Sequence, residues 1–394
     1  MANQREQLGN PRLLRVMNER LLLDRLRETG PTSRVELARL TGLSKPTVSA
    51  ALAGLVDVGL AHVVGQLAGR PGPVASLYDM NAAAAHVLGI DIGREWIRVA
   101  VADLRGEFLA RRDGGNPANT AADLVRRARR LADRAVAEAG VDRASITCAV
   151  IGSPGVLDPA SGRVEFAPNL PGWSRPGLVD RLRDALGVPV RLENDVNLAA
   201  VGEHAYGLGK GKDHFVLISI GTGIGMGIII DGRLYTGSRG AAGEVSYIPS
   251  LDADVTSREE VLSHGATEAA VAASGIARAA QAAGLNLGTA KEIFAAAVAA
   301  DATALAVVEA EGRRIGGLIV AVASVLDPEA VVLSGGVGHN LDLLGEPISK
   351  RIAELGPLRP PVVASTLGES GVLYGAIARA VDEAWRLIFE FRSA

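Results

Sequence analysis

Three stretches of the sequence place carboxylates and glycines where they could bind hydroxyls or phosphate. The first sets Asp91 and Gly93 at the turn between two expected strands. In the second, Asp195 stands just before an expected helix and could act as a base on a sugar hydroxyl. The third, residues 218–227, is a glycine-rich turn whose backbone N–H groups could cradle phosphate at Gly221, Thr222 and Gly223. Each stretch alone is weak evidence of a binding site, whereas the three stretches together and in this order are far more specific evidence.

A different chemistry is expected near the N-terminus, where residues 34–55 have the pattern of a helix-turn-helix. Gly42 permits the left-handed turn between the two helices, and Ser44 is a good N-cap for the second. The first residues of such a helix meet base edges in the major groove. The candidate DNA contacts in this helix are therefore Ser44, Lys45, Pro46, Thr47 and Ser49.

Two short strands are expected within residues 61–80, and their connecting loop presents Arg70. A single arginine on a narrow loop suits insertion into the minor groove, so residues 1–80 are interpreted as a winged helix-turn-helix. The alternative is a helical hairpin with a β-turn that serves dimerisation or protein interaction. Small recognition side chains predict modest affinity per site, which favours a dimer on palindromic double-stranded DNA.

The elements that must position these residues are readable from apolar spacing. We expect helices at 12–28 (apolar at Leu14, Met17, Leu21 and Leu22), 34–40 and 44–58 (apolar at Val48, Leu52, Leu55 and Val56). After residue 81 strands and helices alternate, which is typical of an α/β domain. The expected strands are 87–92, 97–104, 146–151, 215–219, 226–230 and 330–333, and the expected helices are 121–139 and several between 268 and 325.

Composition narrows the class of protein. The 394 residues carry a net charge of −3, whereas residues 1–80 hold 10 Lys and Arg against 7 Asp and Glu, a mildly basic head on an acidic body. The one cysteine, Cys148, lies in an apolar run and is expected to be a buried core residue. The polar N-terminus and the absence of a long apolar run predict a cytoplasmic protein that does not associate with membranes.

Over essentially its whole length the chain resembles the ROK family of repressors, open reading frames and sugar kinases. The resemblance implies a winged helix-turn-helix followed by a two-lobed α/β fold of the actin/hexokinase-like (ribonuclease H-like) ATPase type, with a sugar cleft between the lobes. We accordingly expect a DNA-binding domain at 1–80, a first lobe at 85–200 completed by a C-terminal helix at 371–394, and a second lobe at 201–370. The matching stretches are Asp91–Gly93, Pro154-Gly155, Pro168–Trp173, Glu193–Asn197, Gly221–Gly223, Gly240–Glu244, Gly265–Glu268 and Ser334–Gly336.

The resemblance also implies a set of sugar contacts. Carboxylates and amides suit this role, since each can hold two hydroxyls. The positions that would contact the sugar are Asn169, Asn194, Asp195, Glu244 and Glu268, and Tyr247 stands where the family has a histidine that helps to position the sugar-contacting glutamate.

Two departures from the family change the expected function. The first loop of the kinases continues with Gly and Thr after Asp-x-Gly, whereas here Arg94 and Glu95 follow, and Glu95 would repel a triphosphate. We therefore expect degenerate phosphate loops at Asp91, Gly93, Gly221, Thr222 and Gly223, with Asp195 as a vestigial base and no catalysis. The second departure concerns a structural zinc site, whose four ligand positions hold Tyr247, Glu259, Val261 and Ala266. No metal or other cofactor is expected.

These observations predict a transcriptional regulator, expected to be a repressor of carbohydrate-related genes, with a sugar or sugar derivative as effector. The expected assembly is a homodimer or homotetramer on a palindromic operator. Two alternatives stay open at this stage: an ATP-dependent sugar kinase or bifunctional regulator, and a DNA-binding protein without a small-molecule effector.

Overall fold

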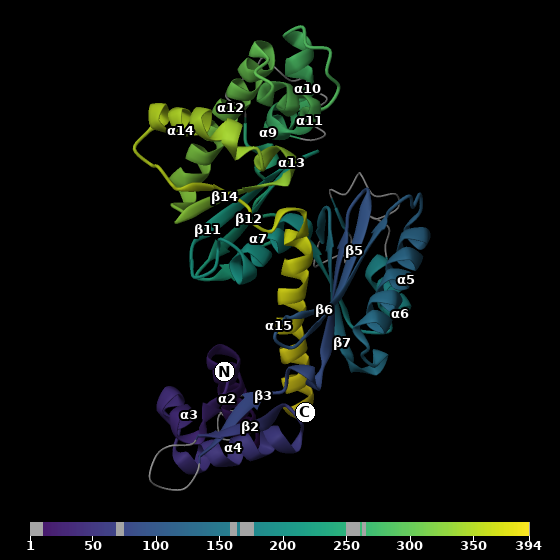
Figure 1. Cartoon of the computed structure of the whole chain (residues 1–394), viewed down its shortest axis with the longest axis vertical. Coiled ribbons are helices and arrows are strands. Elements are labelled where there is room, and N and C mark those ends of the chain that lie inside the picture. The colour runs from purple at the N-terminus through teal and green to yellow at the C-terminus, as the bar shows by residue number, and fades with distance from the viewer. Residues whose placement is uncertain are drawn as a thin grey trace.

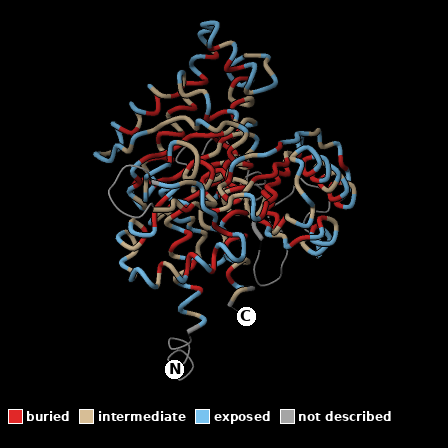
Figure 2. Tube along the Cα trace, turned by 60° about the horizontal axis from the view of Figure 1, so that its bottom comes forward, coloured by how far each residue is buried: buried red, intermediate tan, exposed pale blue. Residues whose placement is uncertain are grey.

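The computed structural model describes residues 11–67, 75–157, 164–165, 177–249, 261 and 265–393. A small N-terminal head precedes two larger lobes, each built on a five-stranded sheet, and the C-terminal helix runs from between the lobes down to the head (Figure 1). Buried residues follow the interior of each part and exposed residues cover its rim (Figure 2).

The head is a helix-turn-helix with a small sheet, as the sequence predicts. Ser33 caps the second helix and Gly42 ends it at φ 70°, so the chain turns sharply into the third helix. The sheet has the order β1-β3-β2, and the loop between β2 and β3 lies outside the described residues. The elements are α2 (Pro11–Thr29), β1 (Thr32–Ser33), α3 (Arg34–Thr41), α4 (Lys45–Asp57), β2 (Ala61–Leu67) and β3 (Ala75–Met80).

The predicted apolar face of α4 is wrong in one residue, and some of the apolar residues that indicated helix α2 are exposed. Leu14 and Met17 of α2 are 49% and 55% exposed, and Val56 of α4 is 39% exposed. The buried face of α2 is carried instead by Val16, Leu22, Leu23 and Leu26. The period of the helix was read correctly, but several apolar residues compete for the buried face, and packing against α4 and the C-terminal helix selects among them.

The first lobe is a mixed sheet of order β10-β7-β4-β5-β6, in which β4, β7 and β10 are parallel and β4, β5 and β6 form an antiparallel meander. Helices α5 (Ala121–Ala139) and α6 (Leu178–Leu186) cover one face. Cys148 is buried in β7, as expected. The strands are β4 (His86–Ile92), β5 (Trp96–Asp103), β6 (Phe108–Gly115), β7 (Ile146–Ser153) and β10 (Val190–Asn194).

The second lobe repeats this topology. Its order β13-β12-β11-β14-β15 again joins an antiparallel meander to parallel strands. This repetition is what the actin/hexokinase-like fold requires of its two halves. The strands are β11 (Phe215–Ile220), β12 (Ile224–Ile230), β13 (Arg233–Leu234), β14 (Ala330–Ser334) and β15 (Val362–Ala364); the helices are α9 (Ala266–Val271), α10 (Ala273–Ala282), α11 (Ala290–Val298), α12 (Ala302–Leu326), α13 (Gly335–Gly338) and α14 (Leu341–Leu355).

The described residues also form short elements: the strands β8 (Val156–Leu157) and β9 (Val164–Glu165), and the 3-10 turns η1 (Ala82–Ala84), η2 (Arg143–Ser145), η3 (Val245–Tyr247) and η5 (Gly368–Ser370). Within the described part of the chain, no single helix has the length and apolar character to cross a membrane. The α11–α12 pair meets that test only when its two helices, bent by 116°, are taken together.

Two helices link the parts. Helix α7 (Asp195–Tyr206) packs on β11 and β12 of the second lobe and on the C-terminal helix α15 (Gly371–Ser393), which also covers β4, β5 and β7 of the first lobe and reaches α2 of the head. The boundary expected between residues 200 and 201 falls inside α7, because this helix belongs to the contact between the lobes.

Candidate functional site

A cavity of about 180 Å³ lies at the ends of strands from both lobes. Its polar lining comes from separate elements: Asp195 from the start of α7, Ser219 from β11, Ser334 from β14, His339 from the C-cap of α13, and Glu369 from η5. In open α/β sheets, loops at the carboxyl ends of parallel strands converge on one edge, and β10, β11 and β14 supply this edge here. The cavity therefore joins residues that are far apart in the sequence.

Asp195 is held by the start of α7. Asn194, the last residue of β10, caps the helix by accepting a hydrogen bond from the backbone N–H of Asn197 at 3.0 Å, and its amide donates to the carbonyl of Gly155 at 3.2 Å. The backbone N–H of Val196 donates to Asp195 Oδ1 at 2.8 Å. Burial raises the pKa of Asp195, and the backbone hydrogen bonds oppose that shift. The carboxyl is thus held by the start of α7, where it lines the cavity.

Two further carboxylates lie near enough to interact with it. Burial raises the pKa of Glu244, and the negative charges of Asp195 and Glu268 raise it further. Three acidic side chains from α7, the segment before η3, and α9 therefore share one region. Such a group suits a neutral ligand with several hydroxyls, because each carboxylate can accept two hydrogen bonds and repels anions.

The glycine-rich turn is engaged by one of these carboxylates. The backbone N–H of Ile224 donates to Glu268 Oε2 at 3.1 Å, and the N–H of Gly221 donates to the carbonyl of Gly223 at 2.9 Å. A Cβ at Gly223 would lie 2.8 Å from the same Glu268 oxygen. One backbone donor of this turn, the N–H of Ile224, is therefore engaged by a carboxylate of the protein itself.

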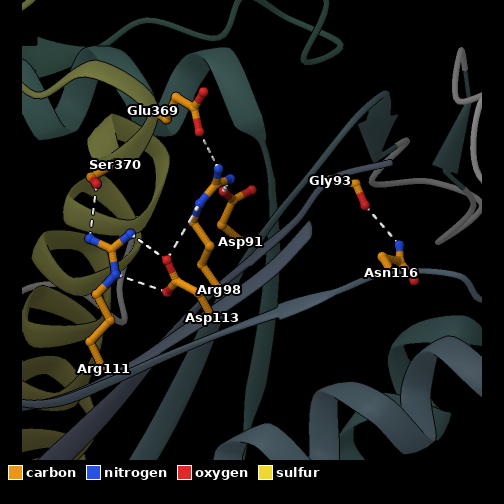
Figure 3. A network of polar contacts seen from close by, with 8 residues as sticks. All are labelled: Asp91, Gly93, Arg98, Arg111, Asp113, Asn116, Glu369 and Ser370. Carbon is orange, nitrogen blue, oxygen red and sulfur yellow. Dashed lines mark hydrogen bonds and ion pairs between the residues drawn. The ribbon is translucent and has the colours of Figure 1, made fainter. Parts of the chain in front are cut away.

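Asp91 is paired with an arginine that the sequence reading did not single out (Figure 3). Arg98 Nη1 lies 3.0 Å from Asp91 Oδ2, and its Nη2 lies 2.6 Å from Glu369 Oε2. Arg111 of β6 pairs with Asp113 at 2.8 Å and donates to Ser370 Oγ at 2.9 Å. Burial raises the pKa of Asp91 to about 7, although Arg98 opposes the shift. Asp91 is thus paired within the protein, and Arg98 and Arg111 connect β5 and β6 to η5, just before α15.

Among the described residues, the structure does not place the other predicted sugar-contacting residues together in the cavity. Tyr247 ends η3 with 48% of its surface exposed, and Asn169 lies outside the described residues. Asn194, expected to contact sugar, has its amide oxygen and nitrogen both engaged by the protein, so its cap role is what the geometry displays.

The donor set does not fit a structural zinc ion. Val261 and Ala266 carry no donor atom in their side chains, whereas a structural zinc takes four Cys, His or carboxylate ligands. Among the residues that the structure describes, no three His, Cys, Asp or Glu side chains are grouped to hold a metal.

The candidate DNA interface is the exposed start of α4. Ser44 caps the helix by accepting a hydrogen bond from the backbone N–H of Thr47 at 3.3 Å, and the two hydroxyl oxygens lie 2.8 Å apart. Lys45 and Pro46 are exposed, and Ser49 is half-buried. The predicted helix and cap are confirmed, while Arg70 lies outside the described residues.

Comparison with known proteins identifies the family. The model of the ROK family matches residues 87–383, three quarters of the chain. The chain belongs to the ROK family. A model described as the IclR helix-turn-helix domain matches residues 21–65, so this ROK chain carries a helix-turn-helix ahead of its two lobes.

Individual relatives include both enzymes and regulators. A glucokinase of Halalkalibacterium halodurans is 30% identical over 73% of this chain and 93% of its own length. A xylose repressor of Bacillus subtilis is 28% identical over 61% of this chain and 62% of its own. A solved ROK family transcriptional regulator, homolog of the E. coli MLC protein, has a TM-score of 0.80 at 24% identity and covers 95% of this chain and 98% of its own. The last match shows that head and lobes together form a known fold.

Arg98 and Glu369 are the main residues missed from the sequence. Arg98 interrupts the apolar strand Trp96–Asp103, and an arginine that is only 13% exposed in a strand needs a partner. That position was a usable signal for a buried ion pair. Glu369 gave no such signal, because it lies 271 residues from Arg98 in sequence.

Proposed function

We propose that this ROK-family protein is a DNA-binding transcriptional regulator, a repressor of carbohydrate-related genes, whose operator binding changes when a sugar or sugar derivative occupies the cleft. The observation that carries the proposal is the helix-turn-helix with an exposed α4 start, joined to a ROK body in which the carboxylates of Asp195, Glu244 and Glu268 lie near one another. Similarity to xylose repressors adds support and makes D-xylose one of the first sugars to test.

The protein is proposed to sense rather than phosphorylate. Arg98 occupies the carboxylate of Asp91, and Glu268 occupies a donor of the glycine-rich turn. Both contacts engage a group of these stretches within the protein, whereas phosphoryl transfer depends on groups that hold and neutralise the phosphates. The protein is also proposed to need no zinc, since two of the four ligand positions carry no donor atom.

Sugar phosphorylation is the second candidate function, because the glucokinase relative is 30% identical and Asp195, at the start of α7, lines the cavity. An assay with Mg²⁺, ATP, and D-glucose or D-xylose separates the two. Turnover well above a control without protein supports the kinase and refutes the sensor proposal.

The regulator is tested by selecting bound sequences from a random duplex library with the full-length protein, then titrating the selected duplex with a panel of sugars. We expect enrichment of a palindrome, read by a homodimer or homotetramer, and an affinity change with at least one sugar. Asp195→Ala should remove the response to sugar and leave DNA affinity unchanged, whereas Arg70→Ala should weaken DNA binding. Failure to enrich any sequence refutes the regulator; a sugar response that survives Asp195→Ala refutes the cleft as sensor.

A further inference from the structure

Helix α15 spans the distance between the cleft and the DNA-binding head. The helix runs from between the lobes down to the head (Figure 1). Its first turn follows Gly368 and Glu369, which line the cavity with Val372, and its last turn carries Arg392. The helix is 23 residues long, and a continuous helix moves largely as one body. Any displacement at its start therefore has a route to the head.

The start of α15 is in direct backbone contact with α7. A Cβ at Gly202 of α7 would overlap the carbonyl oxygen of Gly371, and a Cβ at Gly375 would overlap the carbonyl oxygen of Leu198. The buried carboxylate of Glu203 also accepts hydrogen bonds from Ser365 Oγ at 2.5 Å and from the backbone N–H groups of Thr366 and Leu367. Asp195 is the first residue of α7. Because α7 and α15 are in backbone contact, a displacement of α7 at Asp195 must also displace α15.

The other end of α15 is bound to the head by a buried ion pair. Glu19 of α2 is fully buried, and its carboxylate accepts hydrogen bonds from Arg392 Nη2 at 2.5 Å and from Arg15 Nε at 3.0 Å. Trp385 and Phe389 of α15 belong to the same apolar core as α2 and α4. The head therefore shares a hydrophobic core with α15.

Glu19 in turn sets the position of α4. Gly54 of α4 is packed so closely on Glu19 that a Cβ there would overlap Glu19 Oε1. Separating a buried carboxylate from its arginine leaves an uncompensated charge, so Glu19 is constrained to follow Arg392. The contacts form one chain from α15 through Arg392 and Glu19 to α4.

We propose that Glu19 and Arg392 are positioning residues that transmit the state of the cleft along α15 to the recognition helix α4. The inference rests on the proposed regulatory function, since it names the contact by which that regulation reaches DNA. It predicts energetic coupling between the α7–α15 crossing and the head that passes through Arg392.

A double-mutant cycle followed by hydrogen exchange of the full-length protein tests this coupling without DNA or sugar. Gly202→Ala forces α15 away from α7, and Arg392→Gln breaks the ion pair with Glu19. We expect Gly202→Ala to change the exchange of α2 and α4 amides by at least about threefold when Arg392 is present, and by much less in the Arg392→Gln background. Arg392→Lys should restore part of the coupling.

Matched variants keep the test specific. Gly371→Ala adds a methyl group 3.7 Å from Ala199 Cβ, an ordinary contact, and should leave the head unchanged. Arg386→Ala removes an arginine of α15 that pairs with Glu383 and Glu390 of the same helix and should leave the coupling intact. If Gly202→Ala does not fold, Ser365→Ala replaces it as the perturbation.

Two results would overturn the proposal: hydrogen exchange of the head that does not change in Gly202→Ala or Ser365→Ala, or equal changes with and without Arg392. Equal changes would mean that the ion pair only stabilises the head. Because the cycle uses neither ligand, its failure is distinct from failure of the DNA-selection experiment, which would refute the regulator itself.

Discussion

Replacing Asp91 with asparagine should change how the stability of the protein depends on pH. Asp91 is 5% exposed, and burial raises its pKa from 3.8 to about 7 in the folded protein. The folded state therefore holds a proton that the unfolded chain releases near pH 3.8. The free energy of unfolding consequently falls as pH rises from about 4 to about 7, the reverse of a carboxylate stabilised by its ion pair.

The size of the effect follows from the shift. A rise of about three pKa units corresponds to about 4 kcal/mol in full, of which about 2–3 kcal/mol falls between about pH 5 and about pH 8. The amide of Asp91→Asn stays neutral throughout. The stability of the variant relative to the wild type should therefore increase by about 2–3 kcal/mol over that interval, added to a constant loss from the missing contact with Arg98.

Urea-induced unfolding of both proteins, followed by circular dichroism at a series of pH values, measures this difference. Asp113→Asn removes a half-exposed carboxylate from the same network and controls for the loss of one partner of Arg98. A difference between wild type and Asp91→Asn that stays constant from acid to alkaline pH would refute the assignment of a protonated, buried Asp91.

Two more predictions concern other parts of the chain. Glu311 of α12 is fully buried, and burial raises its pKa to about 8. The free energy of unfolding of Glu311→Gln, relative to wild type, should therefore increase by up to about 4 kcal/mol as pH rises from about 5 to about 8. A difference in urea unfolding that does not depend on pH would contradict this. Lys45 is exposed in the first turn of α4. Lys45→Ala should reduce the magnitude of the slope of log affinity against log salt concentration by about one for the selected duplex, measured by fluorescence anisotropy. An unchanged slope would mean that Lys45 does not neutralise a phosphate.

Features encoded by neighbouring residues were readable from the sequence. The turn at Gly42, the cap at Ser44 and the helix after it depend on hydrogen bonds that span a few residues, and the structure confirms them. The order of Asp91, Asp195 and the glycine-rich turn was likewise sufficient to indicate the family and its fold.

What the sequence left undecided depends on contacts between distant segments. Arg98 meets Glu369 across 271 residues, and Glu19 meets Arg392 across 373. No local pattern encodes such a pair, because its energy arises only when two elements are brought together and water is excluded around both charges. The sequence by itself determined an N-terminal helix-turn-helix and a ROK-family body. Only the tertiary structure decided that Arg98 lies between Asp91 and Glu369, and that α15 joins the cleft to the head, since both depend on which charges are buried together.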